Sequence, residues 1–168
     1  MSSRKVSPLN KNLNIISISA LSILILVISS SLAQVIDRPE TGMVIKDEDR
    51  SGYGVLSIHN NWRMDTVAVL ADEDIKPLIA VFIRAKESFN ITGIKDGNYD
   101  LYFTIGNNWN PDKRKFDNVF GYYRYNPSLV FETSEIDDEI EYSIYELDLY
   151  EAKGSNFVPD YFQFPDLR

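Results

Sequence analysis

The single histidine of the chain, His59, is the only side chain that could act as an imidazole base. Ser57 would share its face of a strand, and Asp65 follows after a short turn. A serine nucleophile also needs oxyanion donors and, in many hydrolases, a G-x-S-x-G elbow, which this sequence lacks. We therefore interpret His59 as a surface histidine at a strand end and predict no catalytic residue.

Asn108, Asn110 and Asp112 alternate in "NWNPDK" like the first half of a calcium-binding loop. Lys113 stands where such a loop needs glycine, and Val119 stands where it needs glutamate. These three residues are therefore weak metal candidates, and we predict no cofactor. Two alternatives stay open: a calcium-stabilised structural domain, and a carbohydrate-processing enzyme that uses paired carboxylates.

Aromatic residues form the most prominent surplus in the sequence. Trp109 and Phe116 lie in the polar segment "NNWNPDKRKFDN", and Tyr122, Tyr123 and Tyr125 follow in "GYYRY". Exposed aromatic rings beside Asn and Asp side chains stack on sugar rings or anchor a partner protein. We predict a long loop here, and these five residues are our hypothesis for a binding surface. The alternative for each ring is that it covers a sheet edge and completes the core, as aromatic residues in strands usually do.

The composition excludes several classes of function. The 168 residues contain no cysteine, so disulfides, thiolate nucleophiles and cysteine metal sites are ruled out. The chain is 44% hydrophobic, which suffices for one packed domain. Its formal net charge is −8 and its longest basic run, "KRK", is short. We therefore expect no binding to nucleic acid.

Residues 1–33 have the layout of an export segment. Three basic residues and no acid precede an apolar run, and the run ends in small residues before a cut ahead of Gln34. Residues 13–33 carry no charge and are also long enough to remain as a membrane anchor. Both interpretations place the remainder outside the cytoplasm, secreted or anchored, because the basic residues stay inside.

The remainder indicates a single β domain. Residues 34–50 are polar and predict a linker, and residues 51–168 contain short alternating runs separated by turn signals. "LIAVFIR" is apolar at almost every position, as in a central strand, whereas "SEIDDEIEY" fits either a strand or an acidic helical turn. We predict an antiparallel β-sandwich of about seven or eight strands, with the aromatic tail packed back onto it.

The stretch "SFNITGIKDGNYDLYF", residues 88–103, is the most regular in the chain. Asp96 and Gly97 predict a tight turn between two alternating runs, because glycine takes positive φ without a Cβ clash. "FNITGIKDGNYDLYF" resembles the strand–turn–strand signature of carboxypeptidase-regulatory-like, transthyretin-like β-sandwich domains. The wider chain resembles small exported proteins of uncharacterised function, and neither resemblance implies catalytic residues.

These observations favour a non-catalytic interaction module of the cell envelope. Its expected partner is an envelope protein or a glycan, and residues 13–33 would contact the membrane if they are not removed.

Overall fold

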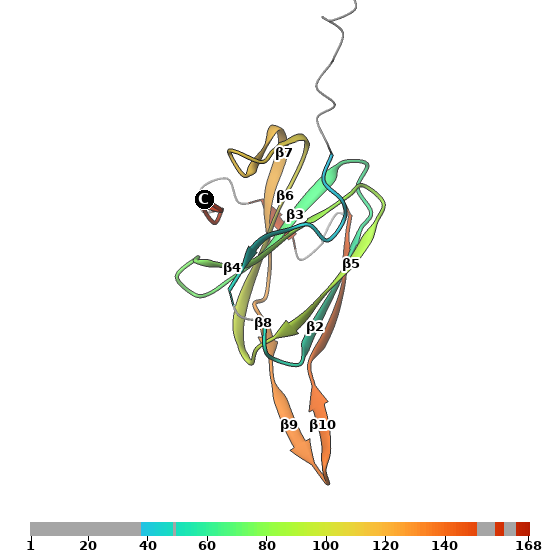
Figure 1. Ribbon diagram of the computed structural model, residues 1–168, viewed down its shortest axis with the longest axis vertical. Coiled ribbons are helices and arrows are strands. Elements are labelled where there is room, and N and C mark those ends of the chain that lie inside the picture. The colour runs from blue at the N-terminus through green and yellow to red at the C-terminus, as the bar shows by residue number, and fades with distance from the viewer. Residues whose placement is uncertain (1–37, 49, 151–156, 160–163) are drawn as a thin grey trace, which may run out of the picture. The chain divides into compact units, whose positions relative to one another are not determined.

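The computed structural model describes residues 38–48, 50–150 and 164–168, together with the backbone of residues 157–159. The all-β prediction is confirmed, with twelve strands in these ranges (Figure 1). The strands are β1 Val44–Asp47, β2 Gly54–Asn60, β3 Asp65–Ala71, β4 Pro77–Ile83, β5 Ser88–Ile94, β6 Gly97–Asn110, β7 Lys115–Tyr125, β8 Leu129–Phe131, β9 Thr133–Ile136, β10 Glu139–Tyr142, β11 Ile144–Leu149 and β12 Phe157–Pro159.

Two main sheets and one separate hairpin contain all of these strands. The larger sheet runs β1-β4-β3-β6-β7-β12, with β8 also paired to β6, and the smaller sheet runs β11-β2-β5. β9 pairs only with β10. The paired strands are antiparallel except β2 and β11, which are parallel. The sandwich-like arrangement agrees with the prediction, whereas the parallel pair and the larger number of strands were not expected.

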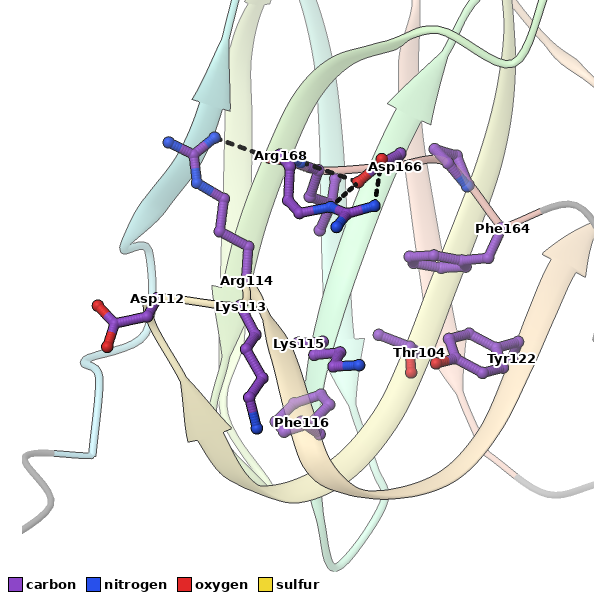
Figure 2. Close-up of a pocket in the computed structure, with 12 residues that line it drawn as sticks. Thr104, Asp112, Lys113, Arg114, Lys115, Phe116, Tyr122, Phe164, Asp166 and Arg168 are labelled. Atoms are coloured by element: carbon purple, nitrogen blue, oxygen red, sulfur yellow. Dashed lines mark hydrogen bonds and ion pairs between the residues drawn. The ribbon is translucent and has the colours of Figure 1, made fainter.

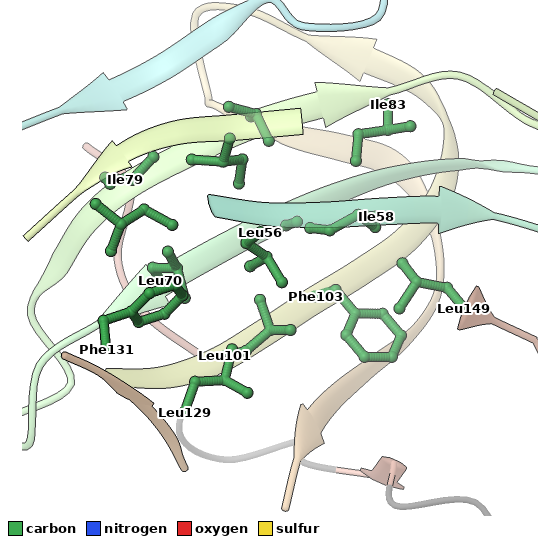
Figure 3. Close-up of a cluster of buried hydrophobic side chains, with 14 of the residues drawn as sticks. Leu56, Ile58, Leu70, Ile79, Ile83, Leu101, Phe103, Leu129, Phe131 and Leu149 are labelled. Carbon is green, nitrogen blue, oxygen red and sulfur yellow. The ribbon is translucent and has the colours of Figure 1, made fainter. Parts of the chain in front are cut away.

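The main core lies between the two sheets. β2 alternates strictly between buried and half-buried residues, and its buried Leu56 and Ile58 meet Leu70 and Phe103 of the larger sheet (Figure 3). Strict alternation is the period-2 pattern of a strand with one face on the core. The sequence pattern of this strand therefore determines which face is buried.

A second core covers the outer face of the larger sheet. β3 is buried at every position, so its Val67 and Val69 face this second cluster while its alternate residues face the first. Phe164 and Leu167 of the C-terminal segment pack into the same cluster. The expectation that the tail packs back onto the sheet is confirmed for these residues, while Tyr161 and Phe162 lie outside the described residues.

The regular stretch at residues 88–103 is a corner between the two sheets. β5 pairs with β2 of the smaller sheet, and β6 pairs with β3 of the larger one. The two alternating runs on either side of Asp96 and Gly97 are therefore joined by a short connection, but they do not pair with each other as the strands of a hairpin would. Both strands alternate apolar and polar residues because each packs one face on the core that the two sheets share. A local sequence pattern does not distinguish this arrangement from a hairpin.

The expected linker contains ordered structure. The compact domain begins at Arg38, and β1 lies within the segment 34–50. Residues 13–33, expected to be a signal peptide or anchor, are outside the described residues. Among the residues that are described, no helix is both long and apolar enough to span a bilayer.

Candidate functional site

Trp109 and Phe116 do not lie in a long exposed loop. β6 continues to Asn110 and β7 begins at Lys115, so the connection is a short turn. Trp109 and Phe116 are register partners, and only 5% and 1% of their surfaces are exposed. The predicted long loop is therefore wrong, and the alternative that these rings complete the core holds for both, because the side chains turn inward and pack against Phe82. In this conformation neither ring is accessible for stacking on a ligand.

The three tyrosines of β7 do not form one surface. Tyr122 faces outward and its ring lies 5.0 Å from that of Phe164. Tyr123 faces the main core, where it stacks on Phe103 with ring centroids 5.2 Å apart, and Tyr125 also packs against that core. Alternation along a strand sends neighbouring side chains to opposite faces. Of the three, only Tyr122 lines the cleft between the β6–β7 turn and the C-terminal segment.

His59 joins a row of hydrogen bonds across the smaller sheet. Its Nδ1 lies 2.7 Å from Ser88 Oγ, and its Nε2 lies 2.9 Å from Glu146 Oε1. Neither Ser57 nor Asp65 is its partner, since Asp65 binds Arg38 and accepts a hydrogen bond from the Ala85 amide.

A hydrolytic triad needs a substrate cleft and donors for the oxyanion. The His59 row instead lies on the solvent-facing side of the sheet, where 73% of the Glu146 side chain is exposed. The row therefore connects strands β5, β2 and β11, and it provides no enclosed reaction centre.

The weak metal candidates form a turn. Asn110 Oδ1 accepts a hydrogen bond from the Lys113 amide, and Asn110 Nδ2 donates to Asp117. Asn108 has a φ of 56° and is exposed, as is Asp112. Within the described residues, no group of three His, Cys, Asp or Glu side chains is placed to hold a metal ion.

The β9–β10 hairpin is the most unusual surface of the domain. It extends beyond the end of the two sheets (Figure 1). Six acidic residues lie between positions 132 and 141, and no lysine or arginine occurs from 125 to 152. The segment "SEIDDEIEY" is therefore a hairpin rather than the helical turn that we also considered. These carboxylates make this end of the molecule strongly negative, and their like charges repel one another.

Apolar side chains lie among these acids. We define the apolar stripe as Tyr53, Ile140, Tyr142 and Ile144, which are 53%, 46%, 43% and 64% exposed. The last three alternate along the chain, and the Tyr53 and Tyr142 rings lie 6.2 Å apart. Ile136, 52% exposed, lies near the tip of the hairpin. Clusters of exposed large apolar residues with a charged border are typical of protein-binding surfaces.

The tip of the hairpin has an unfavourable backbone conformation. Asp137 and Asp138 have φ values of 53° and 67°, in the region where a two-residue turn favours Asn-Gly. Two adjacent carboxylates therefore occupy positions where an uncharged pair would fold at lower cost. The base of the hairpin is held by Asp96, which accepts hydrogen bonds from the Thr133 amide and hydroxyl at 3.1 and 2.7 Å.

A cleft of about 740 Å³ lies between the β6–β7 turn and the C-terminal segment. We call it the basic cleft, because four basic side chains and only two acidic ones line it. Figure 2 shows Lys113 and Lys115 on one side and the Tyr122 and Phe164 rings on the other. The lining residues are Thr104, Asp112, Lys113, Arg114, Lys115, Phe116, Tyr122, Phe164, Pro165, Asp166, Leu167 and Arg168.

The basic side chains of the cleft differ in their partners. Arg114 donates to the Leu167 carbonyl at 2.7 Å, and Lys113 pairs with Asp117 at 3.1 Å. Lys115 has no ion-pair partner among the described residues. The hydrogen bonds from the Arg168 side chain and amide hold the pKa of Asp166 below its ordinary value. The cleft therefore offers cationic donors to an incoming anion.

No family model, curated protein or solved structure matches this chain. The structure bears out the resemblance to transthyretin-like domains only as an all-β domain built mainly of antiparallel sheets. The candidate site accordingly rests on the hairpin and the basic cleft themselves.

Sequence reasoning found neither feature as a site. The base-free run from 125 to 152 was a visible signal for the acidic hairpin. The basic cleft had no comparable signal, because the C-terminal segment and the β6–β7 turn come together only in the fold.

We expect Arg168→Gln to raise the pKa of Asp166 towards its ordinary value, because the variant removes the charged hydrogen-bond donor. The depressed pKa means that the pair stabilises the folded chain above the unfolded pKa of 3.8 and loses this effect as pH falls through the folded pKa. A ¹³C NMR titration of the Asp166 carboxyl checks this shift. An unchanged midpoint would show that the Arg168 contact does not persist in solution.

Proposed function

We propose that this chain is a non-catalytic, extracytoplasmic interaction module, and that its acidic hairpin docks on a protein surface rich in lysine and arginine. The observation that carries the proposal is the exposed apolar stripe, which has three of its four residues within a base-free acidic segment. Burying the stripe removes apolar surface from water, and the acids select a basic partner. The layout of residues 1–33 supports a location outside the cytoplasm.

The charge of the hairpin indicates which class of partner is favoured. Glu135, Glu139 and Glu141 are all exposed, so they remain hydrated until a partner approaches. Exposed charges of this kind speed encounter with an oppositely charged surface and reject acidic ones. A nucleic acid or a strongly anionic glycan would be repelled.

A lysine- and leucine-containing amphipathic peptide is a defined probe of this surface. We expect it to shift the amide NMR resonances of residues 133–144, and to bind roughly tenfold more weakly to Glu139→Gln/Glu141→Gln at low salt. Ile140→Ser/Ile144→Ser should also weaken binding, because it removes apolar contact area.

The matched control is Glu73→Gln/Asp74→Asn, which makes the same charge change at exposed positions between β3 and β4. It should leave the affinity of the peptide close to that of the wild type. If the control and the hairpin variant lost the same affinity for the peptide, net charge alone would explain the effect, and the proposal would be abandoned.

A further inference from the structure

We propose that the partner of the acidic hairpin is a second copy of this chain, whose basic cleft receives the hairpin head to tail. This inference rests on the proposed function, because it names the partner of the same surface. Two features of one molecule carry it: a negative, apolar projection, and a cleft that offers positive charge and aromatic walls.

The charges of the two surfaces are complementary. The hairpin contains five acids and no base, and Glu132 directly precedes it. Lys113, Arg114 and Lys115 form the only run of three basic residues in a chain of net charge −8, and all three line the cleft. Arg168 adds a fourth basic side chain from the C-terminal segment. A strongly acidic chain therefore concentrates four of its basic side chains at this cleft.

The side chains at the hairpin tip match the chemistry of the cleft. The carboxylates of Asp137 and Asp138 can accept hydrogen bonds from Lys115, and from Arg168 in exchange for Asp166. The Arg168–Asp166 pair is suited to such exchange, because 75% and 64% of its side chains are exposed. Ile136 beside the tip would meet the wall formed by the Tyr122 and Phe164 rings, whose centroids are 5.0 Å apart.

The positions of the two surfaces allow continued growth. The hairpin lies at one end of the domain, and the β6–β7 turn that lines the cleft lies towards the other end (Figure 1). No residue belongs to both surfaces. A pair formed in this way keeps one hairpin and one cleft unoccupied, so that further copies can add. Contacts between different surfaces of identical molecules close into rings or extend into filaments.

Two charge-reversed variants test the pairing. The hairpin variant is Glu135→Lys/Glu139→Lys, and the cleft variant is Lys113→Glu/Lys115→Glu; all four side chains are exposed. In sedimentation velocity at low salt, we expect the wild-type full chain to sediment faster as its concentration rises. Each variant alone should remain monomeric, because the hairpin variant has lost nearly all of the net negative charge of its hairpin and the cleft variant has made its cleft net negative like its hairpin.

The decisive sample is an equimolar mixture of the two variants. The acidic hairpin of the cleft variant can enter the basic cleft of the hairpin variant, which is a wild-type pair of surfaces that neither component offers alone. We therefore expect the mixture to regain the concentration-dependent association that both components have lost. All samples keep the same N-terminal segment and, where it is retained, the same detergent, so its contribution is constant.

The control Glu73→Lys/Asp74→Lys reverses two exposed acids outside both surfaces and should associate like the wild type. A wild-type chain that stays monomeric at every concentration, or a mixture that stays monomeric, overturns the inference. Peptide binding at residues 133–144 would then separate the two proposals. If binding persists without self-association, the module docks on a different basic protein, whereas loss of both rejects the hairpin as a docking surface.

Discussion

Replacing Trp109 with alanine is expected to lower the free energy of unfolding by about 3–5 kcal/mol, as for other buried large-to-small substitutions. Trp109 is 5% exposed and packs edge-on against Phe82 and Phe116, with ring centroids 5.8 and 5.4 Å away. The variant removes the indole from the second core and leaves a cavity between strands β4, β6 and β7. Urea denaturation followed by circular dichroism measures the loss.

Trp109→Phe keeps an aromatic ring in the core but removes the indole Nε1–H group, so it tests whether aromatic packing alone accounts for the contribution of Trp109. The buried indole Nε1 has no hydrogen-bond acceptor among the described residues, so its removal breaks no bond. We expect this variant to cost about 1 kcal/mol, because most of the aromatic packing remains. If Trp109→Ala kept wild-type stability and instead lost affinity for the peptide, Trp109 would be a contact residue and its burial would be wrong.

Local sequence patterns predicted the fold class because a strand with one buried face has apolar residues at every second position. Leu56 and Ile58 alternate with half-buried residues, and both lie in the main core. The same alternation does not predict which strand pairs with which. Residues 88–94 and 97–110 alternate in the same way, although they belong to different sheets.

The long loop predicted around Trp109 was wrong because local composition does not show how a segment packs in the fold. Asn107, Asn108 and Asn110 suggested a loop, yet they are the last residues of a long strand, where Asn108 takes a positive φ. The indole is buried in a cluster that also includes Phe164 and Leu167. That cluster depends on a segment more than fifty positions away, which no local window contains.

The two candidate surfaces differ in the same way. The acidic hairpin is contiguous, so its charge can be read from residues 132–144 alone, whereas the exposure of its isoleucines is known only from the structure. The basic cleft combines Thr104, Lys115 and Arg168 from distant positions. The charge of a surface built within one hairpin is predictable from sequence, whereas a cleft between a turn and a terminal segment requires the tertiary structure.

Gly93→Ala is expected to destabilise the domain by about 2–5 kcal/mol, because two costs combine at this position. Gly93 has a φ of 78°, and a Cβ atom here would lie 2.7 Å from the Arg50 carbonyl oxygen. Its own carbonyl accepts a hydrogen bond from the Gly52 amide at 3.0 Å, which holds the two segments together. Thermal unfolding of the variant should show a lowered midpoint with a single transition.

Gly97→Ala is the matched comparison, because it carries a conformational cost without the close contact. Gly97 has a φ of 150°, but an added Cβ would meet only the Tyr99 ring, at an ordinary 3.5 Å. The difference in stability between the two alanine variants therefore measures the clash with the Arg50 backbone. Equal losses would mean that this backbone moves aside freely, and residues 50–54 would then not be fixed against β5 as the structure places them.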